Sequence, residues 1–531
     1  MDRPQVDMAI VGAGFAGLYM LHMARQRGLT AQVVEAGGDV GGTWYWNRYP
    51  GARCDVESME YSFGFDDDLQ QEWEWTERYA PQPEILRYAN HVADRFDLRR
   101  DIRFDTRVTA ATYDDESGHW TVTTDRGPVI TARYVVMATG CLSTANIPDI
   151  PGAATFTGPT YHTGRWPHEG VDFTGQRVGV IGTGSSAVQS IPLIAEQADH
   201  LTVFQRTPTY AVPAWNRPLD PVEQKEIKAD YAALRAANRQ SSSAFGGLQP
   251  RNDVSALAVS DEERHAEYER RWAVGGLTFL GAYNDLLLVR AANETARQFV
   301  IGKLHEIVED PEVAAKLTPD QVVGCKRLCV DTGYWATFNR PNVTLVDLRE
   351  TPIEAITERG IRTTGAEHEL DAIVYATGFD AMTGALARID IRGRGGRPLA
   401  DAWSAGPRTY LGLMVAGFPN LFTITGPGSP SVLTNMIESI QQHVEWIGRC
   451  LADLGAAGAT TIEATPEAQD AWVDYVNSVA GFTLFPTCNS WYLGANVPGK
   501  TRVFMPLPGF PTYVQQCEDI VADGYRGFTR A

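Results

Sequence analysis

The chain has 531 residues, which corresponds to about three or four compact units at ~150 residues each, so a single small module or a disulfide-stabilised mini-protein is excluded. Hydrophobic residues make up 44% of it and charged residues 21%, a composition typical of globular proteins. Its 46 Lys and Arg residues against 65 Asp and Glu residues leave a net charge of −19. Because this field repels anionic polymers and lipids, we expect neither nucleic acid nor a membrane as a partner.

The cysteines and the N-terminus indicate where the protein works. Seven cysteines, an odd number without a regular framework, favour a reducing compartment. Cys325 and Cys329 lie four positions apart without further Cys or His residues at metal-ligand spacing, so we interpret them as packing thiols and expect no metal site. The N-terminus lacks a basic region and a cleavage site, and no run of ~18 uninterrupted apolar residues occurs. These features predict a cytoplasmic protein.

The first informative segment is a short apolar strand that ends in a glycine turn. Gly12 and Gly14 allow a tight turn and the close approach of a pyrophosphate, and Gly17 lets the following helix touch the strand. The next strand, residues 31–34, ends in Glu35, which can hold both hydroxyls of a ribose. Strand, turn, helix and acid together predict a dinucleotide-binding fold at the start of the chain.

The same pattern recurs after residue 177. The turn contains Gly182, Thr183, Gly184, Ser185 and Ser186. The residue that lies 23 positions after the first glycine is Glu35 in the first unit and Gln205 in the second. A carboxylate there would repel a 2′-phosphate, whereas neutral Gln205 followed by Arg206 and Thr207 offers a guanidinium and a hydroxyl to one, so the second site should prefer NADP.

The other segments predict an interleaved α/β architecture. Strands at residues 135–140 and 373–380 end alike, Ser260 to Glu263 forms a capping-box pattern in a Glu-, Lys-, Arg- and Ala-rich stretch, and a strand at 419–425 precedes a helix at 435–447. We therefore predict two Rossmann-like dinucleotide-binding domains with a helical insertion. The predicted boundaries are 1–140 and 385–531 for an FAD domain, 152–213 and 335–380 for an NADP domain, and 214–334 for the insertion.

A ribose-binding acid in one site and a 2′-phosphate site in the other indicate FAD and NADPH, with hydride passing from the nicotinamide to the flavin. Disulfide reductases share this layout but need a redox-active cysteine motif beside the flavin, and the sequence contains no Cys-x-x-Cys. Molecular oxygen is therefore the leading acceptor of the flavin's electrons.

Three motifs are similar to those of one family. The segment Phe156-x-Gly158-x-x-x-His162-x-x-x-Trp166-Pro167 resembles the fingerprint of type I Baeyer–Villiger monooxygenases, and residues 41–55 and 326–340 resemble two further segments of it. The resemblance spans residues 6–528. It implies an enzyme that uses NADPH and O2 to insert one oxygen next to a ketone carbonyl, through a flavin C4a-peroxide anion and a tetrahedral adduct, giving an ester or lactone.

The resemblance also implies roles for single residues. Arg327 would stabilise the peroxide and the adduct, with Asp55 as its ion-pair partner. His162 lies in a linker, and the matching family residue is thought to serve domain coupling, so we do not expect it to act as a general base. The implied FAD contacts are Gly12, Gly14, Gly17, Glu35, Thr43, Trp44, Tyr45, Trp46, Asp55, Tyr61, Val108 and Met436. The implied NADP contacts are Gly182, Thr183, Gly184, Ser185, Ser186, Gln189, Arg206, Thr207, Lys326, Arg327 and Trp491. The implied pocket residues are Gln82, Pro83, Cys141, Leu142, Leu433 and Met505.

Two alternatives remain open. A flavin oxygenase of amines or sulfides would keep the flavin hydroperoxide neutral, which the predicted cation at Arg327 disfavours. A non-catalytic flavin and nucleotide redox sensor would need no such cation. The ketone is also open, because residues 426–433 resemble the phenylacetone and steroid branch of the family whereas Asp331 to Tyr334 resembles the cyclohexanone branch. We expect a small ketone and O2 as partners.

Overall fold

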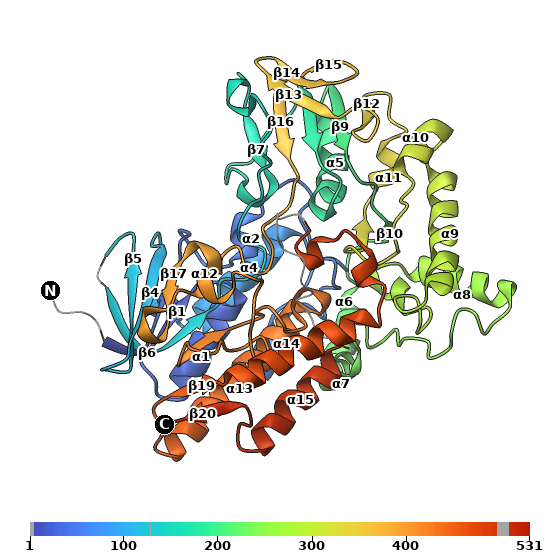
Figure 1. The fold of residues 1–531 in the computed structure, drawn as a ribbon. Coiled ribbons are helices and arrows are strands. Elements are labelled where there is room, and N and C mark those ends of the chain that lie inside the picture. Colours follow the sequence, from blue (N-terminus) through green and yellow to red (C-terminus); the bar gives the residue numbers. More distant parts are fainter. Residues whose placement is uncertain (1–4, 128, 496–508) are drawn as a thin grey trace.

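The computed structural model describes residues 5–127, 129–495 and 509–531. It confirms the predicted α/β class, because two mainly parallel sheets lie in separate parts of the molecule (Figure 1). In each sheet, a glycine turn connects one strand to the helix that follows it. Among the described residues no helix is long and apolar enough to cross a membrane.

The first sheet is built around β1 (Gln5–Val11), which pairs in parallel with β2 (Ala31–Val34) on one side and with β6 (Ile130–Met137) on the other. Its strand order is β17-β4-β5-β6-β1-β2-β3, and β18 (Leu421–Thr423) also pairs with β6. The remaining strands are β3 (Ile102–Arg103), β4 (Val108–Asp114), β5 (His119–Thr124) and β17 (Asp390–Arg392). The C-terminal part of the chain therefore returns to the sheet that the N-terminus begins.

Helices from both ends of the chain cover this sheet. Helix α1 (Phe15–Gln26) packs against α13 (Met436–Ala456), and their apolar faces share one core. The predicted helix at 435–447 is thus confirmed, and the structure extends it to residue 456. The other helices and strands of this half are α2 (Thr43–Trp46), α3 (Asp67–Glu72), α4 (Gln82–Arg95), α12 (Leu399–Ala402), α14 (Pro466–Gly481), α15 (Phe510–Ala522), β19 (Ile462–Ala464) and β20 (Phe528–Arg530).

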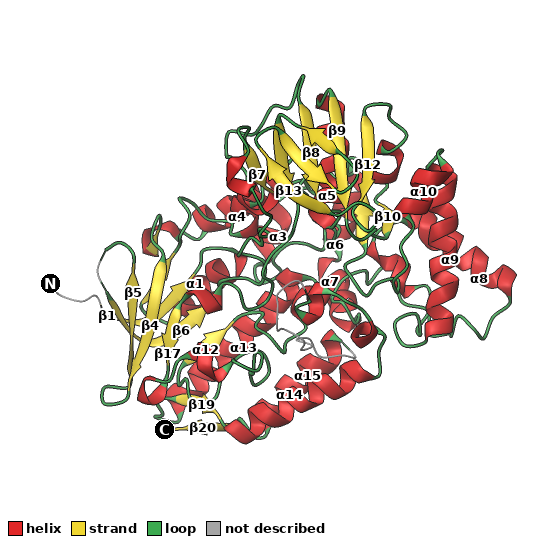
Figure 2. Ribbon diagram, turned by 45° about the horizontal axis from the view of Figure 1, so that its top comes forward, coloured by secondary structure: helices red, strands yellow, loops and turns green. Residues whose placement is uncertain are grey.

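The second sheet is entirely parallel, with the strand order β12-β9-β8-β16-β7, and lies at the top of Figure 1. Its strands are β7 (Thr160–His162), β8 (Arg177–Ile181), β9 (His200–Gln205), β12 (Val343–Asp347) and β16 (Ala372–Tyr375), with α5 (Ser185–Gln197) following the glycine turn. A small antiparallel sheet of β13 (Ile353–Thr357), β14 (Gly360–Thr363) and β15 (Glu367–Glu369) adjoins it (Figure 2). This arrangement is a second Rossmann-like unit.

The two glycine turns need glycine for steric reasons. A Cβ added at Gly17 would lie 1.9 Å from the carbonyl oxygen of Gly12, so no larger residue lets α1 approach the turn. Gly12 has φ +105° and its Cβ would lie 2.6 Å from the carbonyl oxygen of Ala138, at the end of β6. Gly182 repeats this relation, with φ +112° and 2.5 Å to the carbonyl oxygen of Ala376 after β16. The two strands that end alike in the sequence, β6 and β16, thus each end against one of the two glycine turns.

The predicted helical stretch contains α6 (Pro221–Ala229), α7 (Tyr231–Gln240), α8 (Asp261–Val274), α9 (Arg290–Ile307) and α10 (Pro311–Leu317), and near its end the short strand β11 (Cys329–Asp331). The capping box is confirmed, since the side chains of Ser260 and Glu263 each bond the other's backbone N–H. Helices α8 and α9 belong to the core of the second sheet. Tyr231 of α7, in contrast, packs in the core of the first sheet and donates a hydrogen bond to the Met59 carbonyl at 2.6 Å. The stretch therefore contacts both halves of the molecule.

Candidate active site

Asp55 and Arg327 come from different halves of the chain, and their side chains lie close together. Asp55 lies in the loop that follows α2, and Arg327 immediately precedes β11 (Cys329–Asp331), which pairs with β10 (Ala211–Pro213). The Arg327 Nε and the Asp55 Oδ2 are 3.8 Å apart, and the Arg327 Nη1 donates to the Val432 carbonyl at 3.1 Å. The guanidinium is thereby held by the carboxylate on one side and by a backbone dipole on the other.

Tyr492 is a third contact of Arg327 that the sequence reasoning missed. Its hydroxyl lies close enough to the guanidinium for the Arg327 charge to lower its pKa, but burial outweighs this effect and raises the pKa of Tyr492 to about 12. The side chain is 3% exposed. Its only sequence signal is its position next to Trp491, which drew attention because of its resemblance to a nicotinamide-ribose contact. The phenol is neutral at physiological pH, so it does not cancel the charge of Arg327.

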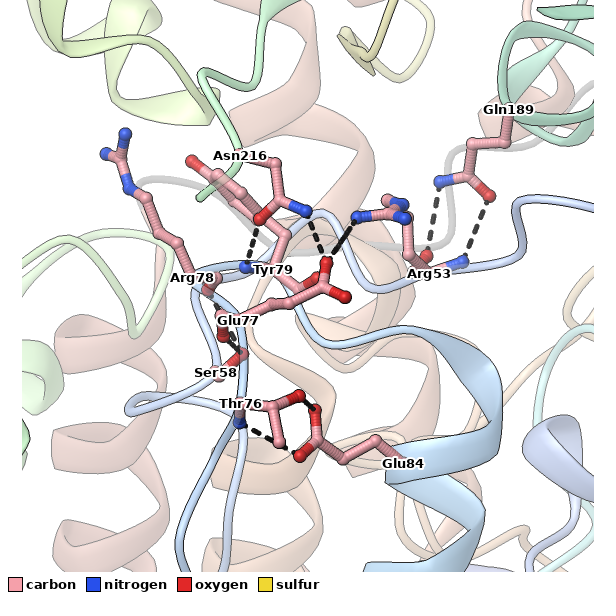
Figure 3. Close-up of polar contacts among 9 residues, drawn as sticks. All are labelled: Arg53, Ser58, Thr76, Glu77, Arg78, Tyr79, Glu84, Gln189 and Asn216. Carbon is pink, nitrogen blue, oxygen red and sulfur yellow. Dashed lines mark hydrogen bonds and ion pairs between the residues drawn. The ribbon is translucent and has the colours of Figure 1, made fainter. Parts of the chain in front are cut away.

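Gln189 binds the loop of Asp55 to the second dinucleotide unit. Its side chain, which is 4% exposed, donates to the Arg53 carbonyl at 3.1 Å and to Asp55 Oδ1 at 3.2 Å. Its amide oxygen accepts from the Tyr49 hydroxyl at 2.8 Å and lies 3.4 Å from the Arg53 backbone nitrogen. The amide, which reaches from α5 in Figure 3, therefore binds the loop of Asp55; the family resemblance implies that Gln189 is an NADP contact.

Arg53 anchors this loop at its other side. The Arg53 Nη1 lies 3.2 Å from Glu77 Oε2, which also accepts from the Asn216 side chain at 2.5 Å. The Asn216 amide oxygen in turn accepts from the Tyr79 backbone N–H at 3.0 Å. Figure 3 shows Arg53 and Asn216 converging on Glu77. The loop of Asp55 is thus bound directly to Gln189 and Glu77, and through Glu77 to Asn216.

Asp55 has an elevated pKa. Burial raises the pKa of its carboxyl from 3.8 to about 6, although the Arg327 charge and the hydrogen bond from Gln189 lower it. Above pH ~6 the carboxylate is ionised and attracts Arg327, and below it the neutral acid does not. The ion pair is therefore complete only on the alkaline side of this value.

We expect ketone conversion to decline as the pH falls through about 6, because Asp55 then takes up a proton and Arg327 loses its charged partner. Asp55→Asn should lower the maximal rate about 10²-fold at neutral pH, since a misplaced catalytic group costs this much. The variant should also lose the inflection near pH 6, whereas Asp114→Asn, an exposed and distant change, should keep it. A rate profile in which Asp55→Asn retains the wild-type inflection would contradict this role.

Glu35 lies beside the first glycine turn, as the dinucleotide pattern predicts. Its carboxylate accepts from the Ala13 backbone N–H at 2.7 Å and from the Gly37 N–H at 2.6 Å, and it is 6% exposed. Burial raises its pKa above the usual 4.5, against these hydrogen bonds. A buried carboxylate at the end of β2 can accept hydrogen bonds from the hydroxyls of an adenosine ribose, and the adjacent tight turn lets a pyrophosphate approach the backbone.

Glu35→Ala should weaken FAD binding by ~10-fold to ~10²-fold, since hydrogen bonds to a charged group are worth ~1.5–3 kcal/mol. Glu35→Gln, which keeps one acceptor oxygen, should lose less. Flavin content after purification and titration of the apoprotein with FAD measure the effect, and far-ultraviolet circular dichroism reports whether the chain stays folded. Full FAD occupancy in Glu35→Ala would show that the ribose lies elsewhere.

The other predicted flavin residues form two groups. Helix α2 supplies Thr43, Trp44, Tyr45 and Trp46, and the Trp44 indole N–H donates to the Tyr61 hydroxyl at 3.2 Å. Gly14 lies opposite this helix, since its Cβ would be 3.4 Å from the Gly42 Cα. Val108 begins β4 and Met436 begins α13, so the two lie on different elements. Trp44, Tyr61 and Val108 are buried, and their positions also contribute to the core.

The second glycine turn is open at Gly184, whereas Gly42 covers the equivalent residue of the first turn, Gly14. A Cβ at Gly184 would meet no atom of the described residues within 4 Å. Nearby, the Thr183 hydroxyl donates to the Thr207 carbonyl at 2.7 Å, and the Ser186 hydroxyl donates to Thr163 Oγ1 at 3.1 Å. Ser185 Oγ lies 3.4 Å from the Cys329 sulfur. The start of α5 is therefore accessible to the phosphates of a dinucleotide.

Two cations lie near this turn. Arg206, at the end of β9, is exposed. Burial lowers the pKa of Lys326, and the positive charge of Arg206 lowers it further, so the two groups are close enough to repel each other. Gln205 is fully buried and donates to the Lys316 carbonyl at 2.8 Å, so no carboxylate stands at this position. Two like charges with a neutral strand end fit a dianionic 2′-phosphate.

Three of the predicted pocket residues lie in one apolar cluster near Arg327. Cys141, Leu142 and Leu433 pack together with Met436 and Trp491. The same cluster contains Val432, whose carbonyl binds Arg327. Gln82 and Pro83 lie elsewhere, where they line a cavity of about 670 Å³ with Arg48 and residues of α4, and the Gln82 amide donates to the Trp44 carbonyl. Met505 lies outside the described residues.

His162 is occupied by structural contacts. Its Nδ1 accepts from the Gly164 backbone N–H at 2.9 Å, and its Nε2 lies 3.5 Å from the Thr377 hydroxyl. The ring is 5% exposed, and burial lowers its pKa below 6.5. Its contacts join β7 to the segment after β16, in agreement with a coupling role instead of proton transfer.

Comparisons with known proteins show which family the chain is related to. A family model described as pyridine nucleotide-disulphide oxidoreductase matches residues 9–245. The chain is 44% identical over 529 residues to a Baeyer-Villiger monooxygenase of Pseudooceanicola batsensis, with 99% of this chain and 96% of that protein covered. It is 41% identical over 532 residues to the phenazine N-monooxygenase PhzNO1 of Lysobacter antibioticus, with 99% and 97% covered. A solved structure of an oxidised steroid monooxygenase bound to NADP matches with a TM-score of 0.95 and 55% identity, covering 99% of both chains.

Two Rossmann-like units with a partly buried arginine–aspartate pair define a flavin- and NADP-dependent oxidoreductase. Its cofactors are FAD and NADP(H), which solved relatives contain together. The chain belongs to the Baeyer–Villiger monooxygenases and is an FAD-dependent monooxygenase.

Proposed function

We propose that Arg327, oriented by Asp55, is the catalytic cation with which this enzyme converts a small apolar ketone and O2 into an ester or lactone at the expense of NADPH. The observation that carries this proposal is the guanidinium held between Asp55 and the Val432 carbonyl beside an apolar cluster. FAD reduced by NADPH supplies the activation of oxygen. Oxygen insertion into a ketone develops negative charge on oxygen, and a fixed cation in a water-poor site stabilises that charge.

Each cofactor has a set of residues that would hold it. The glycine turn at Gly12, Gly14 and Gly17 with Glu35 would hold FAD, and α2 would cover it. The turn at Gly182 and Gly184 with Arg206, Thr207 and Lys326 would hold NADPH, with Trp491 near its nicotinamide ribose. The Trp491 indole is a hydrogen-bond donor only, which suits a hydroxyl acceptor.

The substrate class follows from the cluster of Cys141, Leu142 and Leu433, whose side chains are apolar or weakly polar. Such a surface favours a hydrophobic ketone over a charged substrate. A panel of linear, cyclic and aryl ketones, assayed by oxygen-dependent NADPH oxidation with mass analysis of the products, tests the assignment. An enzyme that forms only N-oxides or sulfoxides would instead be a heteroatom oxygenase, and one that binds both cofactors without product would be a redox sensor. We further propose a cytoplasmic location, where NADPH is supplied.

Arg206→Ala should raise the KM for NADPH ~10-fold to ~10²-fold, because a charge-assisted phosphate contact is worth ~1.5–3 kcal/mol. The maximal rate of flavin reduction and the KM for NADH should change little, since NADH lacks the 2′-phosphate. Arg340→Ala removes another exposed arginine of the same unit and should leave both constants unchanged. Unaltered discrimination between the two coenzymes in Arg206→Ala would leave Lys326 as the main phosphate contact.

A further inference from the structure

The loop that joins β18 to α13, residues 424–435, supplies a backbone contact to the candidate active site. Its Val432 carbonyl accepts the hydrogen bond from Arg327 Nη1. Two of its residues have left-handed backbone although neither is glycine, Thr425 with φ +54° and Ser431 with φ +43°. Because residues with a side chain adopt this conformation only at a cost, the loop needs contacts that keep its shape.

The two strained residues are bonded to each other. The Ser431 hydroxyl donates to the Thr425 carbonyl at 3.2 Å. The Ser431 carbonyl accepts in turn from the Thr434 hydroxyl at 2.8 Å and from the Thr434 backbone N–H at 3.0 Å. Val432 lies between these bonded residues, so the direction of its carbonyl depends on where Thr425 and Ser431 are held.

His443 of α13 holds the backbone of Thr425. Its Nδ1 accepts from the Thr425 N–H at 2.8 Å. Its Nε2 lies 2.8 Å from the hydroxyl of Tyr513 in α15, and that hydroxyl donates to the Leu411 carbonyl at 2.7 Å. Both rings are buried, His443 with 0% and Tyr513 with 1% of its surface exposed. The imidazole thus ties the loop to two other segments of the chain.

These bonds fix the protonation of the imidazole. A phenol has one proton to donate, and Tyr513 gives it to Leu411, so the Tyr513 oxygen accepts from the Nε2–H of His443. Nδ1 then carries no proton and can accept from Thr425. The ring is neutral, in agreement with burial, which lowers the pKa of His443 to about 3. Each nitrogen therefore has one partner, and only this tautomer satisfies all the bonds.

We propose that His443 is a positioning residue for oxygen transfer: its Nδ1 fixes the strained loop, so that the Val432 carbonyl stays on Arg327. This inference rests on the proposed function of Arg327. Without the bond to Thr425 the loop relaxes, the Val432 carbonyl moves away, and Asp55 alone holds the guanidinium. More of the oxygen consumed should then appear as hydrogen peroxide and less as ester.

Two amide variants separate the two nitrogens of the imidazole. The side-chain oxygen of asparagine is as many bonds from Cβ as Nδ1, and the side-chain amide nitrogen of glutamine is as many bonds from Cβ as Nε2. His443→Asn therefore keeps the acceptor for Thr425, whereas His443→Gln keeps only the donor for Tyr513. Each variant loses one buried hydrogen bond, so the melting temperature of both should fall.

The test measures ester formed per NADPH consumed, with the purified FAD-loaded enzyme and a ketone that the wild type converts. His443→Gln should lower this ratio ~10-fold, less than the ~10²-fold cost of a fully misplaced group because Asp55 still contacts Arg327, with a matching rise in hydrogen peroxide. His443→Asn should keep most of the wild-type ratio, and flavin reduction by NADPH should be unchanged in both. An equal ratio in the two variants would overturn the proposal, because a purely structural histidine affects both alike.

Hydrogen exchange provides a second readout that needs no turnover. Peptides covering residues 424–434 should exchange their amide hydrogens faster in His443→Gln than in the wild type, and at nearly the wild-type rate in His443→Asn. Leu454→Ala removes a fully buried side chain of the same helix, so it should lower the melting temperature and leave both the ester ratio and the exchange of this loop unchanged.

A milder variant keeps the test decisive if His443→Gln does not fold. Tyr513→Phe removes only the hydroxyl that orients the imidazole, so loop exchange should rise and the ester ratio should lie between those expected for the wild type and for His443→Gln. Unchanged exchange and an unchanged ratio in Tyr513→Phe would overturn the proposal. An enzyme that forms ester from no ketone would refute the proposed function, whereas wild-type exchange of the loop in His443→Gln would refute the role of His443 alone.

Discussion

Arg327→Ala should reduce ester or lactone formation at least ~10³-fold, because the variant lacks the cation that stabilises negative charge on the oxygen being transferred. FAD should remain bound, since the residues around the first glycine turn are untouched. Reduced flavin should still react with O2, and the oxygen should appear as hydrogen peroxide. Gas chromatography with mass detection of the product and a peroxide assay, each expressed per NADPH consumed, measure how the activated oxygen is divided between ester and hydrogen peroxide.

Isotopically labelled O2 and a conservative variant sharpen this experiment. The wild type should place one labelled atom in each ester molecule. Arg327→Lys keeps a positive charge but lacks the planar guanidinium that contacts Asp55 and Val432, so its product yield should lie between those of the wild type and of Arg327→Ala. Labelled ester formed by Arg327→Ala at nearly the wild-type rate would remove Arg327 from the mechanism.

Gly17→Ala should yield protein almost free of flavin. The added methyl carbon would lie 1.9 Å from the Gly12 carbonyl oxygen, which is rigid backbone, so α1 must move away from the turn that would hold the FAD pyrophosphate. Overpacking of this kind costs ~3 kcal/mol or more, which corresponds to at least ~10²-fold weaker FAD binding. Absorbance of the purified protein near the flavin maximum and titration with FAD measure the loss.

A second helical glycine provides the matched control. Gly302 lies in the exposed part of α9, and a Cβ there would meet no described atom within 4 Å. Gly302→Ala should therefore keep full flavin content and stabilise the protein by ~0.5–1 kcal/mol, because alanine is the better helix former. Normal FAD content in Gly17→Ala would mean that α1 can shift without affecting the cofactor site.

Local patterns made much of the fold predictable from the sequence. The glycine turn at Gly12 and its repeat at Gly182 each depend on a few neighbouring residues, and the capping box of Ser260 spans only four positions. The same holds for the contrast between Glu35 and Gln205, which is a difference at one strand end. Such features need no knowledge of tertiary contacts, so the two Rossmann-like units follow from the sequence.

The contacts that join these units could not be predicted in the same way. The amide of Gln189 follows a recognisable turn, yet its hydrogen bonds go to a loop in the other half of the chain. The hydrogen bond of Arg327 to the Val432 carbonyl likewise depends on how distant segments pack. No periodicity or spacing encodes them, because each depends on the three-dimensional arrangement of whole units.

The hydrogen bonds of Gln189 make the orientation of Asp55 conditional on the relative position of the two Rossmann-like units. Gln189 belongs to α5, whereas Arg53 and Asp55 belong to the loop after α2, so a sliding or hinge motion between the units breaks all of these bonds together. Asp55 would then lose its neutral partner, and Arg327 would lose the carboxylate that orients it. We infer that Arg327 is correctly oriented only while the coenzyme unit lies against the flavin unit, so that the proposed oxygen transfer would depend on contact between the two units.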